Sequence, residues 1–282
     1  MLFPSGLFVR EAGASQPPSS TYSATAQAYF DAVDTASGTL SETFMDAFDA
    51  LLTDGDTNGW LSGMLAFKPY AGGTEASAEI NALDPGTYDT NFINGPTIDT
   101  VIGVKFNGTN QYGDSGIQPS TVFSSFDDWQ IGSLVITKGV AAASDGYTFG
   151  ASSISTNRIM LREYDLSETD NHCIIYGNGD AGYSAEATTS YSDGDIIAAV
   201  RIASNDMRLY YDTTQADNNV TTPTFSLLPA VNFYEGGRND SGSLITPSDC
   251  KMCCMFYAEG WSITNYTDFV ADMETFKTAI GI

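Results

Sequence analysis

The chain has 282 residues, 42% of them hydrophobic, so it is long enough to bury a large core. Its 11 lysines and arginines stand against 35 aspartates and glutamates, which gives a formal net charge of −24. That charge repels phosphate backbones, and the sequence has no basic patch, so we expect no binding to nucleic acid. No apolar run approaches the roughly 18 residues of a membrane span, so we also expect no membrane insertion.

The first 20 residues predict an extended N-terminal arm with a polar tail. The apolar residues at its tip favour docking onto a partner subunit over a disordered end. These residues are Leu2, Phe3, Leu7, Phe8 and Val9. They are not preceded by a basic region, and Pro4 interrupts them, so the arm does not match a secretory signal.

Residues 21–81 predict a helical anchoring segment. Ser23 and Ser41 each precede apolar residues at helical spacing, which indicates two capped helices. Gly55 is expected near the end of the second helix. A third short helix is expected over residues 60–67.

From residue 82 the pattern changes to short strands divided by turns. The expected strands are 101–106, 130–137, 147–149, 158–164, 172–176, 196–203, 208–211, 231–234 and 250–257. Asn-Gly, Asp-Gly and similar pairs stand between them. This pattern predicts a mainly β fold, a sandwich or jelly roll over residues 82–262. The amphipathic residues 263–282 predict a C-terminal helix packed on the sandwich.

Three stretches occur in an order that resembles one family. They are ETFMDAFDALLTDGDTNGWLSGMLAF, then GVKFNGTNQYGDSGIQPS, and finally FYEGGRNDSGS with MFYAEGWSITNYTDFVADMETFKTAIG. Together they resemble bacteriophage and prophage virion proteins with a concanavalin A-like (laminin G-like) jelly roll. The resemblance covers about 40–282 with gaps and matches nothing in 130–225.

The resemblance implies a non-enzymatic structural component of a virion surface, such as a tail fibre, receptor-binding or head-decoration subunit. The protein would be made in the host cytoplasm and would join other virion proteins through its N-terminal arm. A homo-oligomer and contact with a host-surface glycan are expected from the same resemblance. A soluble glycan-binding lectin is the alternative, and a degenerate glycan hydrolase is a third reading, because this fold hosts several functions.

Few residues predict catalysis. His172 is the one histidine, and nothing around it marks a nucleophile for a catalytic triad. The glycine-rich sequence GNGDAG at 177–182 is not followed by the helix that a dinucleotide site needs. Glu163, Asp165 and Glu168 have the spacing of a glucanase carboxylate array, but a regular strand would turn Glu168 to the other face. We therefore predict no catalytic residues.

Two motifs suggest metal ions. Asp54, Asp56 and Asn58 match the first half of a calcium-binding loop, although Leu65 stands where a bidentate glutamate belongs. Calcium is therefore a weak candidate, and no other cofactor is expected. Cys253 and Cys254 would point to opposite faces of a strand, so buried thiols are favoured over a zinc site.

Exposed tyrosines on a sandwich can stack on sugar rings, and polar side chains can bond to sugar hydroxyls. The candidates for a ligand-binding site are Tyr112, Asp114, Tyr183, Tyr191, Tyr234, Arg238 and Asn239. Each tyrosine could equally be a packing residue.

Overall fold

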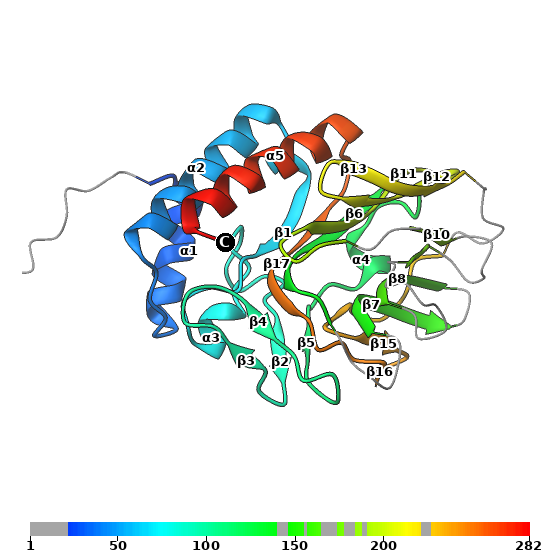
Figure 1. Ribbon diagram of the computed structural model, residues 1–282, viewed down its shortest axis with the longest axis horizontal. Helices are drawn as coiled ribbons and strands as arrows, with labels where there is room; N and C mark the ends of the chain where they lie inside the picture. Colours follow the sequence, from blue (N-terminus) through cyan, green and yellow to red (C-terminus); the bar gives the residue numbers. More distant parts are fainter. Residues whose placement is uncertain are drawn as a thin grey trace, which may run out of the picture.

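The computed structural model describes residues 22–139, 146–154, 157–164, 174–177, 184–187, 191–220 and 227–282. These residues form three layers: a layer of helices, an eight-stranded sheet and a nine-stranded sheet (Figure 1). We call the sheet beneath the helices the inner sheet and the other one the outer sheet. The predicted mainly β, jelly-roll-like sandwich is confirmed.

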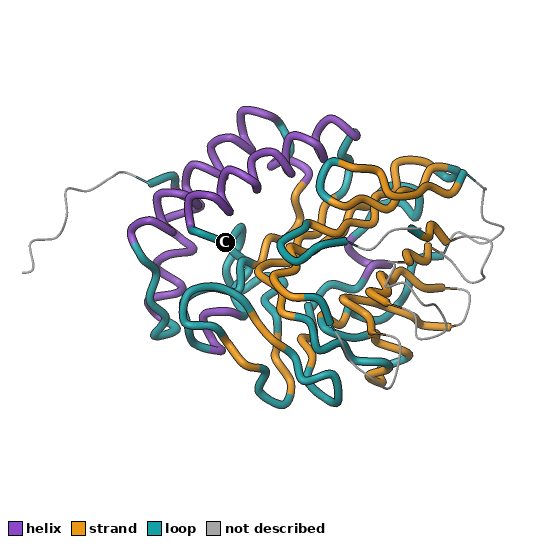
Figure 2. The backbone as a smooth tube through the Cα atoms, in the orientation of Figure 1, coloured by secondary structure: helices purple, strands orange, loops and turns teal. Residues whose placement is uncertain are grey.

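The helix layer consists of α1 (Ala24–Thr35), α2 (Glu42–Asn58) and α5 (Ile263–Ile280). Both predicted caps are present: the hydroxyl oxygens of Ser23 and Ser41 accept hydrogen bonds from the amides of Ala26 and Phe44. Two further helices, α3 (Glu75–Ala78) and α4 (Pro119–Val122), are single turns. Figure 2 shows the long helices gathered on one side of the strands. None of the helices in the described ranges is long and apolar enough to cross a membrane.

The inner sheet has the order β13-β12-β11-β6-β17-β4-β3, and β1 pairs with β17 beside this path. Its strands are β1 (Met64–Lys68), β3 (Thr97–Ile98), β4 (Val104–Lys105), β6 (Trp129–Thr137), β11 (Ile196–Ala203), β12 (Asp206–Tyr211), β13 (Thr214–Asn219) and β17 (Lys251–Ala258). All neighbours in this sheet are antiparallel.

The helix predicted over 60–67 is wrong. Only Leu61–Gly63 is helical, as a 3₁₀ turn, and β1 follows it directly. Ala66 packs into the core between the sheets while Phe67 packs under the helices, so β1 is buried on both faces. An apolar run of this length is compatible with a buried strand and with a buried helix. Here it forms a strand because its backbone pairs with β17. Residues 21–81 therefore contribute to the sandwich and are not only a helical anchoring segment.

The outer sheet has the order β10-β9-β8-β7-β14-β5-β2, with β15 and β16 beside it. Its strands are β2 (Asn91–Ile93), β5 (Tyr112–Asp114), β7 (Gly146–Ile154), β8 (Asn157–Tyr164), β9 (Ile174–Gly177), β10 (Ser184–Glu186), β14 (Tyr234–Glu235), β15 (Arg238–Asp240) and β16 (Ser243–Ile245). Both β14 and β15 pair with β7, the first antiparallel and the second parallel.

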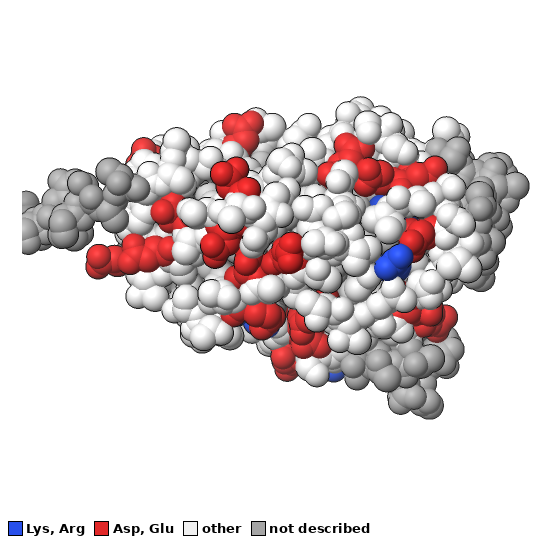
Figure 3. All heavy atoms as spheres, turned by 90° about the horizontal axis from the view of Figure 1, so that it is seen from above, with Lys and Arg blue, Asp and Glu red and all other residues white. Residues whose placement is uncertain are grey.

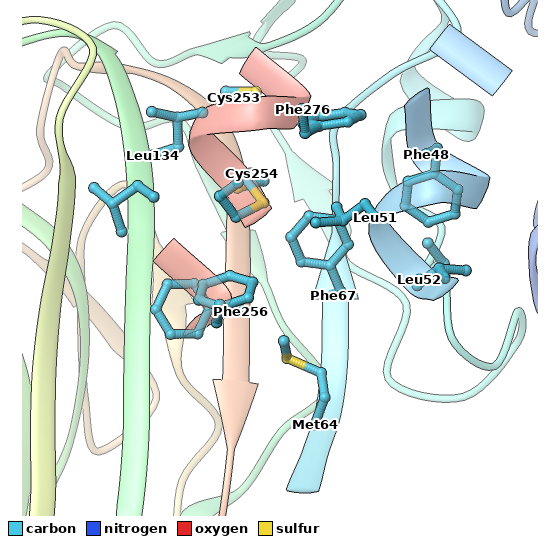
Figure 4. Close-up of a cluster of buried hydrophobic side chains, with 14 of the residues drawn as sticks. Phe48, Leu51, Leu52, Met64, Phe67, Leu134, Cys253, Cys254, Phe256 and Phe276 are labelled. Atoms are coloured by element: carbon cyan, nitrogen blue, oxygen red, sulfur yellow. The ribbon is translucent and has the colours of Figure 1, made fainter. Parts of the chain in front are cut away.

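The two cores meet along β17, which has an irregular register at Cys253. Cys253, Cys254 and Phe256 all pack toward the helices, whereas Met252 and Met255 face the outer sheet. The prediction that Cys253 and Cys254 point to opposite faces is wrong, because the register shift between Met252 and Cys254 breaks the alternation. Figure 4 shows both thiols in the apolar cluster below α5. Both are free and buried, as expected of packing residues.

Candidate functional site

The face of the outer sheet that points away from the inner sheet, which we call the distal face, holds most of the predicted binding residues. Phe149 of β7 and Leu161 of β8 pack into the core between the sheets. Side chains alternate along a strand, so Gly150 and Met160 lie on the distal face. On β5 and β14, Gly113 and Glu235 point inward.

Four residues on the distal face form one row across neighbouring strands, in the order Asp114, Tyr234, Gly150 and Met160. Tyr234 of β14 lies opposite Asp114 of β5 on one side and opposite Gly150 of β7 on the other. Gly150 in turn lies opposite Met160 of β8. Neighbouring strands are about 4.8 Å apart, so the row spans about 14 Å.

Tyr112, two residues before Asp114 on β5, lies beside this row and forms an aromatic pair with Tyr234. Their ring centroids are 4.3 Å apart and the ring planes differ by 33°. Tyr234 is buried with 6% of its surface exposed, while Tyr112 is half-buried. Burial first, and then the hydrogen bond with Tyr112, raise the pKa of Tyr234 to about 12, so its hydroxyl stays protonated at neutral pH. Tyr112 therefore presents the accessible ring, and Tyr234 supports it from below.

Asp114 places a carboxylate beside this pair. Its Oδ1 accepts hydrogen bonds from the backbone amide of Gly116 at 3.1 Å and from the side-chain amide of Asn232 at 2.8 Å. Both bonds fix the orientation of the carboxylate, which is half-buried. The carboxylate can accept hydrogen bonds from a ligand that lies along the row.

Arg238 and Asn239 of β15 differ in what they can do. The guanidinium of Arg238 lies 5.1 Å from the centroid of the Tyr147 ring and donates to the Tyr147 hydroxyl at 3.3 Å. Asn239 is buried, donates to the carbonyl of Asn232 at 2.9 Å and accepts from the amide of Gly242 at 2.7 Å. Arg238 thus remains a candidate for ligand contact, whereas the amide of Asn239 holds two loops together.

Tyr191 does not belong to the site. Only 2% of its surface is exposed, because it packs between the sheets beside Tyr211 at a centroid distance of 5.8 Å. The prediction that it binds a ligand is therefore wrong, and its ring is a core residue. Tyr183 lies outside the described residues, as do Asp165, Glu168 and His172.

The weak calcium site at Asp54, Asp56 and Asn58 is not a loop. All three residues lie within the last two turns of α2, and the buried side of this helix, which includes Gly55, packs below α5. Successive residues of a helix are turned by about 100°, so Asp54 and Asp56 point to opposite sides. The side-chain amide of Asn58 donates to Asp272 at 2.9 Å. Across the described ranges, no group of three or more His, Cys, Asp or Glu residues is arranged to hold a metal ion.

A buried polar cluster lies directly behind the row, and none of its residues is predicted from the sequence. Glu235, next to Tyr234, accepts hydrogen bonds on Oε1 from Lys68 at 3.1 Å and Tyr257 at 2.9 Å. Its Oε2 accepts from Tyr70 at 2.7 Å and from Thr90 at 2.8 Å. Lys68 and Glu235 are both fully buried. Burial lowers the pKa of Lys68, and the charge of Glu235 opposes that shift.

This cluster, comprising Lys68, Tyr70, Thr90, Glu235 and Tyr257, sets the position of the strands that carry the row. It joins β1 and β17 of the inner sheet to β14 of the outer sheet. A Cβ atom on Gly113 would lie 2.5 Å from Cγ2 of Thr90 and 3.0 Å from Oε2 of Glu235. Glycine is thus required between Tyr112 and Asp114 for β5 to approach the cluster.

Comparisons with known proteins identify the fold. A scan against protein-family models finds no match, and a search of curated proteins finds none. Among solved structures 161 chains match. A mutant of Trypanosoma rangeli sialidase with trans-sialidase activity is 13% identical, with a TM-score of 0.54 over 82% of this chain and 39% of that chain. T. rangeli sialidase in complex with sialic acid is 14% identical, with a TM-score of 0.54 over 76% and 34% of the two chains.

A domain of an extracellular arabinanase from Geobacillus stearothermophilus, solved with arabinotriose, matches less well. It is 12% identical, with a TM-score of 0.49 over 74% of this chain and 98% of that chain. At such identities the similarity shows the fold alone. The chain spans about two fifths of the length of the first sialidase chain.

The prediction that the chain is not an enzyme is contradicted by these matches, because sialidases are among the solved chains that share its fold. That prediction rested on missing motifs, such as a triad around His172, which belong to other folds. The virion location, the partners of the N-terminal arm and the homo-oligomer stay predictions. The arm lies outside the described residues, and the comparisons do not bear on them.

Proposed function

We propose that the chain binds a glycan on the distal face, where Tyr112 lies beside Tyr234 and Asp114 of the row. The observation that carries the proposal is the convergence of two separate strands, β5 and β14, which bring an aromatic pair and an oriented carboxylate together. Aromatic faces stack on sugar rings, and carboxylates accept hydrogen bonds from sugar hydroxyls. One of the sialidases with this fold was solved with sialic acid, which supports a sugar as the ligand class.

The two tyrosines have different tasks in this proposal. The half-buried ring of Tyr112 contacts the sugar, and the buried ring of Tyr234 packs against Tyr112 and fixes its side-chain conformation. Asp114 accepts from a hydroxyl of the same sugar while Asn232 and Gly116 hold it in place. Such fixed side chains bind better than loose ones, because little conformational entropy is lost on binding.

The test is a glycan array probed with the full chain, followed by titration of the best ligand against two variants. Tyr112→Ala should weaken binding about tenfold, or 1.4 kcal/mol, the order of one aromatic contact. Tyr112→Phe keeps the ring and should bind within about twofold of the natural chain. If both variants bind as the natural chain does, the row is not the glycan site.

The same ligands should be assayed for sugar release, since the fold occurs in sialidases. Release that is lost in Tyr112→Ala but kept in Tyr112→Phe would extend the proposal from binding to turnover at this face. Release that is unaffected by Tyr112→Ala would place the chemistry elsewhere in the chain.

A further inference from the structure

The row on the distal face is covered at one end and open at the other. Arg238 covers Gly150, because a Cβ atom on Gly150 would lie 3.0 Å from Cγ of Arg238. Met160, the next residue of the row, is buried, and so is Tyr234. At the other end Asp114 is half-buried, and the strand beyond it, β2, is the last in the order of the outer sheet. The part of the row that a ligand can reach is therefore the end beside β2.

Strand β2 extends the row by one residue, Asn91, which the sequence does not predict as a binding residue. Asn91 lies opposite Asp114 across the strand pair. Its neighbour Phe92 packs into the core between the sheets, and side chains alternate along a strand, so Asn91 points to the distal face. Directly opposite residues of two paired strands have Cβ atoms about 4.5–5.5 Å apart. Asn91 thus lies beside the carboxylate of the proposed glycan site.

Asn91 and Asp114 each present a polar group that is available to a ligand. Asn91 is exposed, and its side-chain amide makes no hydrogen bond within the described ranges. Oδ1 of Asp114 accepts from Gly116 and Asn232, which leaves Oδ2 without a donor among the same residues. The amide nitrogen of Asn91 can donate, whereas Oδ2 of Asp114 can only accept. A donor and an acceptor therefore lie side by side.

Apolar groups lie next to this polar pair. Ile93 of β2 lies opposite Tyr112 of β5, and both side chains are half-buried. The faces of a sugar ring carry C–H groups that stack on an aromatic ring, while its rim carries hydroxyls. A sugar that stacks on Tyr112 would therefore direct hydroxyls from its rim toward Asn91 and Asp114.

The charge around the pair favours a neutral ligand. Neither β2 nor β5 carries a lysine or an arginine, and the carboxylate of Asp114 would repel a sugar carboxylate. The formal net charge of −24 adds to this repulsion. Figure 3 shows that acidic side chains also predominate on the side of the molecule that carries α2 and α5.

We infer that the site binds a neutral sugar through two adjacent hydroxyls, one donating to Oδ2 of Asp114 and the other accepting from the amide of Asn91. This inference rests on the proposed function and specifies its ligand. Asn91 then determines specificity, because a sugar that lacks either hydroxyl loses one of the two hydrogen bonds.

The first experiment uses the methyl glycosides of galactose, glucose and mannose, each with its 2-, 3-, 4- and 6-deoxy forms, titrated into the full chain. For the sugar that binds best, loss of either of two adjacent hydroxyls should weaken binding about fivefold, the order of one hydrogen bond. The other two deoxy forms should bind within about twofold of the parent sugar. Any other pattern, or no binding by any of the three sugars, would overturn the inference.

The second experiment tests Asn91 itself. Asn91→Ala should weaken the best of these sugars about fivefold. One of the two deoxy penalties should also disappear in this variant, because the missing hydroxyl no longer has a partner to lose. Asn218→Ala is the matched control, since Asn218 is an exposed residue of β13, the edge strand of the inner sheet, and it should bind as the natural chain does. Unchanged penalties in Asn91→Ala, or an equal loss of affinity in Asn218→Ala, would contradict the role of Asn91.

The preference for a neutral ligand is tested with the sugar that binds best and the uronic acid derived from it. The acid should bind at least about threefold more weakly at low salt, and the difference should shrink as salt is added. Equal or tighter binding of the acid would refute the selection of a neutral sugar.

Failure of the inference can be told from failure of the proposed function. If glycans bind and Tyr112→Ala weakens them but Asn91→Ala does not, the proposed site stands and the inference falls. If Tyr112→Ala and Tyr112→Phe both bind every glycan as the natural chain does, both proposals fall. The melting temperature of Asn91→Ala should match that of Asn218→Ala, which separates a loss of binding from a loss of fold.

Discussion

The Lys68→Met substitution removes the positive charge that faces Glu235 inside the sandwich. Neither side chain has any exposed surface, and Lys68 also donates to the carbonyl of Ser115 at 2.9 Å. Methionine has nearly the same length, so the change leaves no large cavity. Glu235 keeps its three hydroxyl donors, Tyr70, Thr90 and Tyr257, but loses its charged partner.

A buried charge without its partner costs about 3–5 kcal/mol of folding free energy. For a chain of this size that corresponds to a fall in melting temperature of roughly 6–20 °C. The matched control is Lys251→Met, which breaks a 2.7 Å pair with Asp99 whose side chains are 24% and 37% exposed. Exposed pairs contribute about 0–1 kcal/mol, so this control should lower the melting temperature by no more than about 4 °C.

The assay is thermal and urea unfolding of the natural chain and both variants, monitored by circular dichroism. The double variant Lys68→Met with Glu235→Gln should recover part of the loss, because it removes the unpaired charge as well. Equal destabilisation by Lys68→Met and Lys251→Met would refute the reasoning that the buried cluster fastens the two sheets together.

Three further predictions concern single contacts. Gly113→Ala should destabilise the fold by about 1–3 kcal/mol and weaken glycan binding, because its Cβ atom would lie 2.5 Å from Cγ2 of Thr90. Adding Thr90→Ser removes that methyl group and should restore much of the stability and of the glycan affinity, as measured by unfolding and titration. Tyr29→Phe should leave the free energy of unfolding unchanged or raise it, because the buried Tyr29 hydroxyl has no hydrogen-bond partner among the described residues. Tyr266→Phe should lower it by about 1 kcal/mol, because the Tyr266 hydroxyl loses its hydrogen bond to the carbonyl of Asp212. Equal effects of the two variants in unfolding experiments would contradict this prediction. Burial raises the pKa of Asp212, so its ionised form opposes folding: stability is greatest below the unfolded pKa and falls as pH rises through the folded one. Asp212→Asn should therefore gain less than about 1 kcal/mol at pH 7 and nothing at pH 3 in urea unfolding.

Local patterns in the sequence were sufficient for elements that carry their own signal. Strands β6 and β11 are long apolar runs, and α1, α2 and α5 combine a serine cap with helical spacing. Strand β13 was missed because TQADNN is polar throughout, and it becomes a strand only by pairing with the edge of β12. The apolar residues of β1 were predicted to be helical, but they form a strand because they pair with β17, which is distant in the sequence.

The site was predictable to a similar extent. Residue type alone identifies Tyr112, Asp114, Tyr234 and Arg238 as candidates. The structure brings the first three together on the distal face and places Arg238 over the neighbouring Gly150. Their convergence could not be predicted, because it depends on β14 lying between β5 and β7. The buried cluster did leave a signal: Lys68 ends an apolar strand sequence, and a charged residue in such a place is seldom buried without a partner.

The pairing of β1 with β17 affects how the chain folds during its synthesis on the ribosome. Strand β1 and helices α1 and α2 are synthesised early, but their apolar surfaces are covered by β17 and α5, which are synthesised last. Until β17 and α5 have been synthesised, Phe48 and Phe67 of the nascent chain stay exposed to solvent, and exposed apolar surface promotes aggregation. Contacts between such distant parts of a sequence also slow the search for the native state. Recombinant production should therefore improve at low temperature or with added chaperones, and truncations before residue 251 should accumulate as aggregates.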